Sequence, residues 1–566
     1  MTVDLSSDRA EDLNRDQLLE LFVDLGSDGS LVESLMAPGT DLLQGSRGTG
    51  KTMLLRVAYE RLRASRADIV PVFLSFSRYL ATTNPRAGYR DYSPFHSWVI
   101  AKLLECMLAE VGANAAQGAI GNVPIHRYIE RLESHWQDPS VSNRAATASV
   151  LGVAESELIE FDRLDRLVPE LHRILDGARR QSVTFLLDEA SQNFAEELQP
   201  QFFRIVRHLR DARVAVKIAV YPQATVYGRE FDVGHDARVL PIARNVEDRD
   251  AMPFFVELLR RRAGDSGLWK TLEASEVHRD FLVKMSGGNP RWLLHLISRL
   301  PSGTTSLTVP AVLDLGKEVP DSTLWPYLTG LKARLVTKRQ YVENAVALAR
   351  IFIEDLRQFN DERRRERPTP YVAVSQSREL PFRVRAAVGL LEYSGLISRR
   401  SPRRITAREN AQTFIVHPAL LVKEGCLFPQ DSNPPLDRTV RSLTDPPKDV
   451  FKEYTKNSPR LLSDLSAEEV TDLCDECGTA LPEGAKFCPT CGRAVTRSSL
   501  YEELRGASSA ELELTPGVKQ RLVEYGKFPT VGTVLDATEQ QVDEIPYVGE
   551  VRVRVIKAAA EEFVAG

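Results

Sequence analysis

The 566-residue sequence predicts an α/β fold with a parallel sheet, followed by several smaller C-terminal modules. From residue 41 to residue 262, short apolar runs typical of strands alternate with amphipathic runs typical of helices, as in a parallel sheet covered on both faces. The chain is too long for a single hydrophobic core, and a composition of 43% hydrophobic and 27% charged residues is ordinary for globular proteins. We therefore expect one large α/β domain and further domains behind it.

The expected strands are short and nearly continuous in apolar character. The first ends near residue 44, and later ones are expected at 70–76, 183–187, 214–220 and 239–242. Helices are expected over 53–60 and 94–112, whereas 113–165 lacks strand character and is predicted to be an irregular, partly helical insertion. The α/β core would then span 13–262, and a helical lid would span 263–318.

A glycine-rich loop after the first expected strand carries the clearest chemistry. Its spacing of Gly, four residues and Gly-Lys-Thr is a complete Walker A motif, in which glycines let successive backbone N–H groups point at phosphates. Lys51 would add a positive charge, and the Thr52 hydroxyl would ligate Mg²⁺. We expect ATP to bind this loop, which comprises Gly45, Ser46, Arg47, Gly48, Thr49, Gly50, Lys51 and Thr52.

Two further patterns belong with this loop. Asp188 and Glu189 follow an apolar strand directly, so both carboxylates are expected at the carboxyl edge of the sheet, where Asp188 would hold Mg²⁺ and Glu189 would polarise the attacking water. In the stretch 287–294, Asn289 is predicted to cap a helix with Pro290 at its first position. That helix start would fix Arg291 in the first turn.

Walker A, an acidic pair after a strand and a Gly-Asn-Pro-Arg helix start, in this order, resemble an AAA+ ATPase of the origin-recognition-complex (ORC)-like type or its signalling relatives. The resemblance covers about 15–425 and implies a slow Mg²⁺-dependent ATPase with Arg291 as its sensor-2 residue. It places sensor 1 at Gln223 and an arginine finger at Arg238, although an exposed surface arginine is the alternative at 238. An arginine finger implies an ATP-dependent homo-oligomer.

Residues 319–428 are predicted to form a winged-helix domain, which is the DNA-binding module that the resemblance implies. A helix over 381–395 is followed by strands at 396–398 and 413–416, with an arginine-rich turn between them and Arg408 just beyond. These arginines suit DNA phosphates, although a merely solvated surface is the alternative. The set comprises Arg399, Arg400, Arg403 and Arg404.

Two Cys-x-x-Cys-Gly pairs predict a structural zinc site at 470–496. Four thiolates match tetrahedral Zn²⁺ and leave no open position for catalysis, and a redox pair would need an oxidising compartment that nothing else indicates. The expected ligands are Cys474, Cys477, Cys488 and Cys491, whereas Cys106 and Cys426 are expected to be buried, reduced thiols. Such a zinc ribbon would contact DNA, RNA or protein. A linker rich in Pro, Asp and Ser is predicted before it, at 429–469.

The last segment, 499–566, is predicted to be a small all-α domain. Residues 545–550 resemble a helix-hairpin-helix, but Tyr547 replaces the first glycine of that pattern. Acidic side chains also outnumber basic ones across this segment, which disfavours phosphate binding. Docking to a protein and binding to DNA both stay open for the tail.

The bulk properties narrow the classes of function. No apolar run approaches the ~20 residues that span a bilayer, and the acidic, polar N-terminus predicts a cytoplasmic protein without a membrane partner. The leading hypothesis is an ATP-driven switch that engages DNA. The alternative is a signalling or scaffold protein of a bacterial stress or phage-defence system that recruits proteins, and a processive helicase ranks third because no further helicase motif is visible.

Overall fold

The computed structural model describes residues 10–76, 94–112, 123–134, 143–190, 198–222, 225–228, 230–264, 267–300, 306–334, 339–363, 367–406, 409–463, 465, 505–512 and 514–565. The chain divides into two compact units. Unit 1 comprises 1–245, 250–270 and 288–304, and unit 2 comprises 246–249, 271–287 and 305–566. The chain therefore passes between the units at several points, two of which lie at 245/246 and 287/288.

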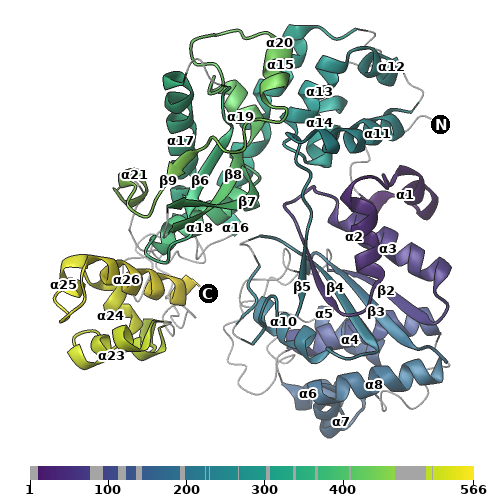
Figure 1. Cartoon of the computed structure of the whole chain (residues 1–566). Coiled ribbons are helices and arrows are strands. Elements are labelled where there is room, and N and C mark those ends of the chain that lie inside the picture. The colour runs from purple at the N-terminus through teal and green to yellow at the C-terminus, as the bar shows by residue number, and fades with distance from the viewer. Residues whose placement is uncertain are drawn as a thin grey trace, which may run out of the picture. The chain divides into compact units, whose positions relative to one another are not determined.

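Unit 1 contains a five-stranded, fully parallel sheet in the order β2-β3-β4-β1-β5 (Figure 1). All its carboxyl ends therefore meet at one edge, where ligands bind in open parallel sheets. Strand β5, at one edge of the sheet, is mostly exposed, whereas β2 at the other edge is mostly buried. The strands are β1 (Thr40–Gln44), β2 (Ile69–Ser75), β3 (Ser182–Asp188), β4 (Val214–Val220) and β5 (Arg238–Pro241).

Two apolar cores cover the two faces of this sheet. Because side chains alternate along a strand, Leu42 belongs to the core under α4, α8 and α10, and Leu43 to the core under α1 to α3. The helices and turns of unit 1 are η1 (Ala10–Asp12), α1 (Arg15–Leu21), α2 (Ser27–Met36), α3 (Lys51–Ser65), α4 (Pro94–Val111), α5 (Ile125–Ser134), α6 (Arg144–Leu151), α7 (Glu155–Phe161), α8 (Leu164–Gly177), α10 (Gln199–His208), η4 (Arg249–Ala251, partly in unit 2), α11 (Met252–Ala263) and α14 (Pro290–Ser298).

The mixed α/β class and the parallel sheet were predictable, and the insertion 113–165 contains α5 to α7 where it is described. The predicted lid, 263–318, is shared between the units. Helix α14 belongs to unit 1, α13 (Glu276–Met285) and α15 (Val309–Val319) belong to unit 2, and α12 (Gly267–Ala274) crosses the division. Helices close in sequence thus pack into different cores.

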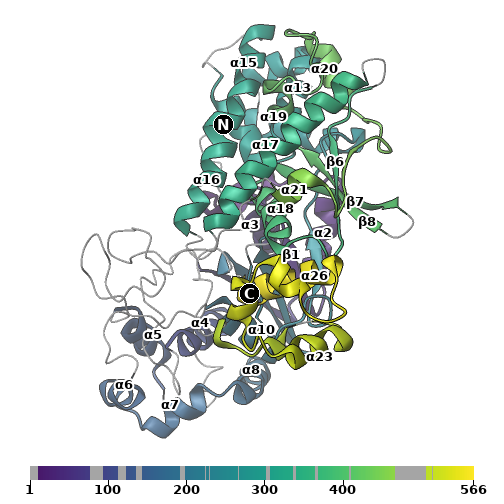
Figure 2. The same cartoon turned by 90° about the vertical axis from the view of Figure 1, so that its left-hand side faces the viewer.

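Unit 2 contains a four-stranded sheet in the order β7-β8-β6-β9. The strands are β6 (Tyr371–Ser375), β7 (Ile397–Thr406), β8 (Glu409–Val416) and β9 (Lys452–Tyr454), and α18 (Phe382–Tyr393) precedes the β7–β8 hairpin. The hairpin extends away from the other strands of this sheet (Figure 2). The remaining helices here are η5 (Pro320–Leu324), α16 (Trp325–Arg334), α17 (Arg339–Glu362), α19 (Pro418–Lys423), α20 (Leu436–Ser442) and α21 (Pro459–Ser463).

Two sequence predictions for unit 2 need correction. The arginine-rich segment is not a turn, because Arg399 to Arg404 lie within β7 and pair with β8. A register shift between Arg399 and Pro402 accommodates the proline, which has no N–H to donate. The predicted linker 429–469 is also folded where it is described: β9 pairs with β6, and Tyr454 is buried.

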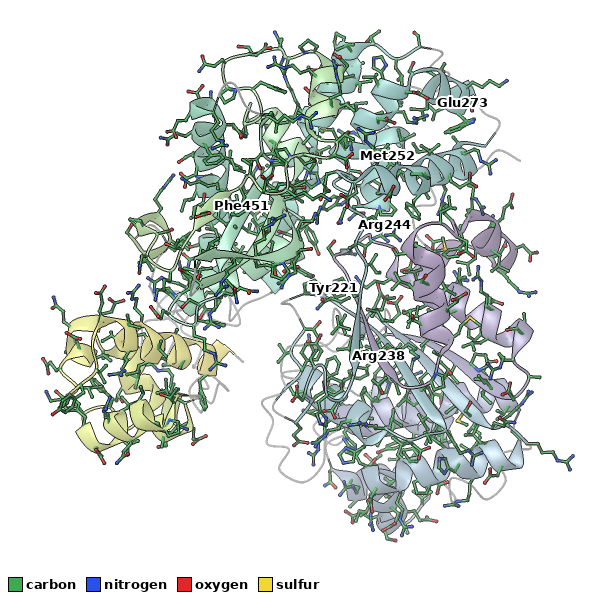
Figure 3. All side chains as sticks on the ribbon, viewed as in Figure 1. Tyr221, Arg238, Arg244, Met252, Glu273 and Phe451 are labelled. Carbon is green, nitrogen blue, oxygen red and sulfur yellow. The ribbon has the colours of Figure 1, made fainter. Side chains whose placement is uncertain are left out.

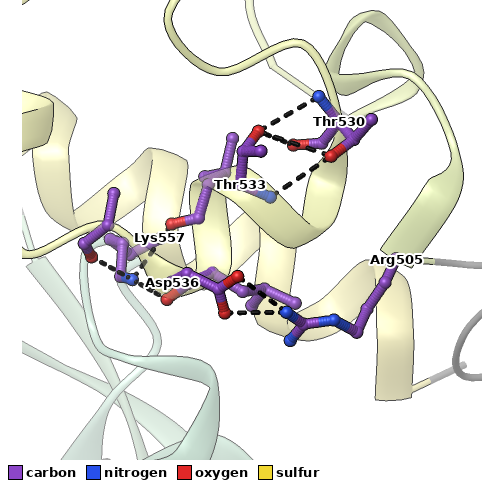
Figure 4. Close-up of polar contacts among 8 residues, drawn as sticks. Arg505, Thr530, Thr533, Asp536 and Lys557 are labelled. Atoms are coloured by element: carbon purple, nitrogen blue, oxygen red, sulfur yellow. Dashed lines mark hydrogen bonds and ion pairs between the residues drawn. The ribbon is translucent and has the colours of Figure 1, made fainter. Parts of the chain in front are cut away.

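The tail forms a small helical domain with its own apolar core. Its elements are η7 (Ser509–Glu511), α23 (Pro516–Tyr525), α24 (Val531–Asp536), α25 (Glu539–Asp543) and α26 (Glu550–Ala565). Helix α24 is fixed at both ends: Thr530 and Thr533 form a capping box, and Lys557 Nζ donates to three carbonyls at its C-terminal end, including Leu535 at 2.6 Å (Figure 4). None of the described helices combines the length and apolar character that crossing a membrane requires.

Candidate nucleotide-binding site

The phosphate loop between β1 and α3 has a conformation that only glycine adopts easily. Gly48 and Gly50 have φ of 84° and 91°, in the left-handed region. A Cβ at Gly48 would lie 2.6 Å from Asn289 Oδ1 and 3.0 Å from Arg291 Cβ, so there is no space for a side chain. The Thr49 hydroxyl donates to Ser46 O at 2.8 Å and tightens the loop. The curled backbone is the cradle that phosphates require.

Lys51 is the first residue of α3, and its ammonium group is buried inside the loop. Nζ donates to Gly45 O at 2.6 Å and to Ser46 O at 3.0 Å, and it lies 3.7 Å from the centre of the Tyr221 ring. Burial lowers the pKa of Lys51, and the positive charges of Arg291 and Arg47 lower it further. An anion bound in the loop would offset these effects and favour the charged ammonium.

Asp188 ends β3 and Glu189 follows it, at the edge of the sheet where the phosphate loop also lies. Burial raises the pKa of Asp188, and the nearby Thr52 hydroxyl acts in the opposite direction. Asp188 Oδ1 accepts the Glu189 N–H at 2.9 Å, whereas Oδ2 is buried and has no hydrogen-bond partner among the described residues. Glu189 lines the pocket beside the loop and has a φ of 60°. Such backbone strain is retained where surrounding structure holds a functional side chain in place.

The start of α14 lies against the phosphate loop. Asn289 caps this helix as predicted, since its Oδ1 accepts the N–H groups of Arg291 and Trp292. The same side chain donates from Nδ2 to Arg47 O at 2.7 Å. Arg291 therefore lies in the first turn of α14, at the edge of the loop. Its positive charge lowers the pKa of Lys51. The structure brings Arg291 together with Lys51, Thr52 and Glu189 in one pocket.

Part of the pocket lining is apolar. These side chains come from the end of α1, from the two residues after it, and from helices α11 and α14. A flat heterocyclic base fits such a surface, because aromatic and aliphatic side chains pack against its faces. The apolar lining residues are Leu21, Phe22, Val23, Phe254, Leu258 and Leu294.

Sequence reasoning missed two residues that touch the phosphate loop. Tyr221, directly after β4, places its ring over Lys51, and Arg244 donates from Nη1 to Thr49 O at 2.6 Å. Figure 3 marks both residues. Tyr221 directly follows the strand expected at 214–220, so its place after a core strand was a usable signal. Nothing local distinguishes Arg244 from the other arginines of the chain.

The predicted arginine finger lies away from this pocket. Arg238 lies at the start of β5, opposite Asp41 in the register of β1, and so toward the amino ends of the strands (Figure 3). Its guanidinium group makes two bonds to the buried Asp41 carboxylate, at 2.7 and 3.2 Å, and Lys217 binds the same carboxylate. Action as an arginine finger would require Arg238 to leave this pair. Gln223 lies outside the described residues.

The four arginines of β7 have different environments. Arg399 makes a two-point ion pair with Glu392 of α18, at 2.7 and 2.9 Å. Arg400 makes a two-point pair with Glu247, whose side chain is only 2% exposed. Arg403 lies 5.8 Å from the Phe451 ring and Arg404 is exposed. Arg399 and Arg400 are thus ion-paired within unit 2 and Arg403 contacts Phe451, whereas Arg408 lies outside the described residues.

The predicted zinc ligands Cys474, Cys477, Cys488 and Cys491 also lie outside the described residues. Within the part of the chain that is described, no group of three or more His, Cys, Asp or Glu residues is placed to hold a metal ion. Cys106 and Cys426 are free thiols, of which Cys426 is buried and Cys106 is half-buried.

Two protein-family models match the chain, one near its N-terminus and one near its C-terminus. Residues 5–77 match the ORC-CDC6-like family model, and residues 473–495 match the zinc-ribbon domain model. The first match contains β1, the phosphate loop and α3, and it suggests a relationship to AAA+ ATPases. The second contains all four clustered cysteines and suggests bound Zn²⁺. Among curated proteins, none matches the chain.

Proposed function

We propose that the protein is an AAA+ molecular switch that binds Mg-ATP in unit 1, hydrolyses it slowly and engages DNA through its C-terminal modules. The observation that carries the nucleotide part is the meeting of three sequence-distant segments: the phosphate loop, the acidic end of β3 and the start of α14. Lys51 would bind the phosphates, and Arg291 would contact the γ-phosphate and thereby report which nucleotide is present.

The residues around Thr52 fit a magnesium ion. The buried, unpartnered Asp188 Oδ2 and the nearby Thr52 hydroxyl are oxygen ligands of the kind that Mg²⁺ prefers. When bound, Mg²⁺ would neutralise charge on the transferred phosphoryl group. Glu189 would hold the attacking water and accept its proton, and its strained backbone conformation fixes the direction in which the carboxylate leaves the strand.

The nucleotide part is tested with two variants. Lys51→Ala removes the buried ammonium group and is expected to abolish ATP binding in equilibrium titrations. Glu189→Gln keeps the shape of the site and is expected to bind ATP with wild-type affinity while phosphate release falls at least ~100-fold, as for loss of a general base. Phosphate release by Glu189→Gln at the wild-type rate would remove that residue from its role.

The DNA part rests on the place of two arginines of β7 in the β7–β8 hairpin. Arg403 and Arg404 lie on the extended hairpin, where guanidinium groups can approach phosphates. The double variant Arg403→Glu/Arg404→Glu should weaken DNA binding and flatten its salt dependence, because fewer counterions are released. Arg438→Glu/Arg441→Glu on α20 changes the net charge equally and is the matched control. Equal DNA affinity in both double variants would contradict this part.

A second candidate is an ATP-dependent signalling or scaffold protein whose C-terminal modules recruit another protein. The pairing of Arg399 and Arg400 within unit 2 favours it, because those charges do not need DNA. If the wild-type protein with ATP binds neither duplex nor single-stranded DNA at low salt, this candidate replaces the first. Mass measurement with and without ATP would test the proposed homo-oligomer in either case.

A further inference from the structure

Three successive carbonyl groups of the phosphate loop accept hydrogen bonds from other segments of unit 1. Arg47 O accepts Asn289 Nδ2 at 2.7 Å, Gly48 O accepts the Arg291 N–H at 3.4 Å, and Thr49 O accepts Arg244 Nη1 at 2.6 Å. The two short bonds come from side chains and the long one from backbone. Arg244 alone among these three donors lies outside the Gly-Asn-Pro-Arg segment.

These bonds fix the direction of the loop amides. In a trans peptide the C=O and the following N–H point in opposite directions, because the six atoms are coplanar. A donor that holds Thr49 O therefore also sets the direction of the Gly50 N–H. Gly50 has a φ of 91° and, like any glycine, loses much conformational freedom when it is held in one orientation. Without this donor, binding phosphate would have to order the loop.

Arg244 is itself held firmly. Its Nη2 binds Asp28 of α2 at 2.5 Å, and both side chains are almost completely buried, at 6% and 5% exposed. Its guanidinium group lies 4.5 Å from the Phe254 ring at the start of α11. Burial raises the pKa of Asp28, and the charge of Arg244 acts against this shift. Arg244 thus connects α2, α11 and the phosphate loop through a single rigid group.

We propose that Arg244 is a positioning residue for phosphate recognition: it holds the Thr49 carbonyl so that the Gly50 amide faces the nucleotide phosphates. This inference rests on the proposed nucleotide binding and extends it to a residue outside the recognised motifs. It assigns Arg244 an effect on ligands that carry a β-phosphate, because the Walker A amides surround that group. The nucleoside part does not use the Gly50 amide, and it depends on Arg244 only as far as the Phe254 ring that Arg244 contacts.

The test compares binding of ATP, ADP and adenosine to wild type and Arg244→Gln. We expect the variant to bind ATP and ADP about tenfold more weakly, which corresponds to about 1.4 kcal/mol, while adenosine, which does not use the Gly50 amide, loses much less affinity. Because Arg244→Gln leaves Asp28 buried without its partner, Asp28→Asn/Arg244→Gln is measured alongside and removes that charge. The control is Arg213→Gln, which also disconnects an arginine from one carboxylate (Asp176) and from backbone carbonyls, but does so at the amino end of β4.

The outcomes separate cleanly. An unchanged ATP affinity in the folded double variant would overturn the inference, as would an equal loss for adenosine, because a merely structural role affects the whole pocket. Failure of wild type to bind ATP would instead refute the proposed function. Loss of ATP affinity in Arg213→Gln to the same degree would show that any lost arginine contact in unit 1 has this effect, and would also overturn the assignment.

Discussion

The pair between Arg400 and Glu247 provides the sharpest test of how unit 2 uses its arginines. Arg400→Gln would leave the Glu247 carboxylate, 2% exposed, without its charged partner. Breaking a buried ion pair at one end costs about 3–5 kcal/mol. For a domain of this size, each kcal/mol lowers the melting temperature by roughly 2–4 °C, so we expect a decrease of roughly 6–20 °C.

The assay is thermal unfolding of the full chain followed by near-ultraviolet circular dichroism, with DNA affinity measured below the transition. Glu247→Gln/Arg400→Gln removes both charges and should recover most of the loss, because the penalty comes from the orphaned carboxylate. Arg404→Gln, on an exposed side chain of the same strand, is the matched control and should melt like wild type. If Arg400→Gln also melts like wild type but loses DNA affinity, Arg400 contacts DNA and the structural reasoning is wrong.

Three further predictions follow from the nucleotide site and its surroundings. Gly48→Ala should abolish ATP binding in titrations while unit 1 stays folded, because a Cβ would lie 2.6 Å from Asn289 Oδ1; near-normal affinity would contradict the loop geometry. At mildly alkaline pH, between the lowered pKa of Lys51 and its ordinary value of 10.5, ATP binding should be accompanied by uptake of a proton, so the affinity for ATP falls as pH rises. Calorimetry in buffers of different ionisation enthalpy measures this uptake. Zero proton uptake would refute the assignment of a lowered pKa to Lys51. Chelation of Zn²⁺ should unfold 470–496 and leave ATP affinity unchanged; an ATP affinity that falls with the zinc content would show that the two sites depend on each other.

Local patterns predicted the elements that local physics determines. The strand expected at 214–220 is β4 with the same bounds, since six of its seven residues are apolar and suit a strand buried on both faces. Asn289 caps α14 as expected, because an asparagine before a proline satisfies the first helical N–H groups without help from elsewhere. The glycines of the phosphate loop were expected to let its backbone curl, and Gly48 and Gly50 adopt positive φ there.

The errors arose where distant segments decide the outcome. Residues 429–469 have a linker-like composition, yet β9 needs only three residues to pair with β6, and that pairing is invisible without knowing where β6 lies. The arginines of β7 suggested a solvated turn, because Glu247, the partner of Arg400, stands 153 residues earlier. The contact of Arg244 with the phosphate loop was not predicted for the same reason. Its partners Asp28 and Thr49 lie 216 and 195 residues away in the sequence.

The two side chains that hold the phosphate loop from outside stand next to points where the chain changes units. Arg244 precedes the crossing at 245/246 by one residue, and Asn289 follows the crossing at 287/288 by one residue. Gly287 has a left-handed backbone, and a Cβ there would lie 2.3 Å from His417 Nε2 in unit 2. A residue beside each crossing is thus hydrogen-bonded to the phosphate loop: Arg244 at the first crossing and Asn289 at the second. At the second crossing, Gly287 is also packed closely against His417. The side chains that hold the phosphate loop thus stand beside two of the points where the chain passes to unit 2.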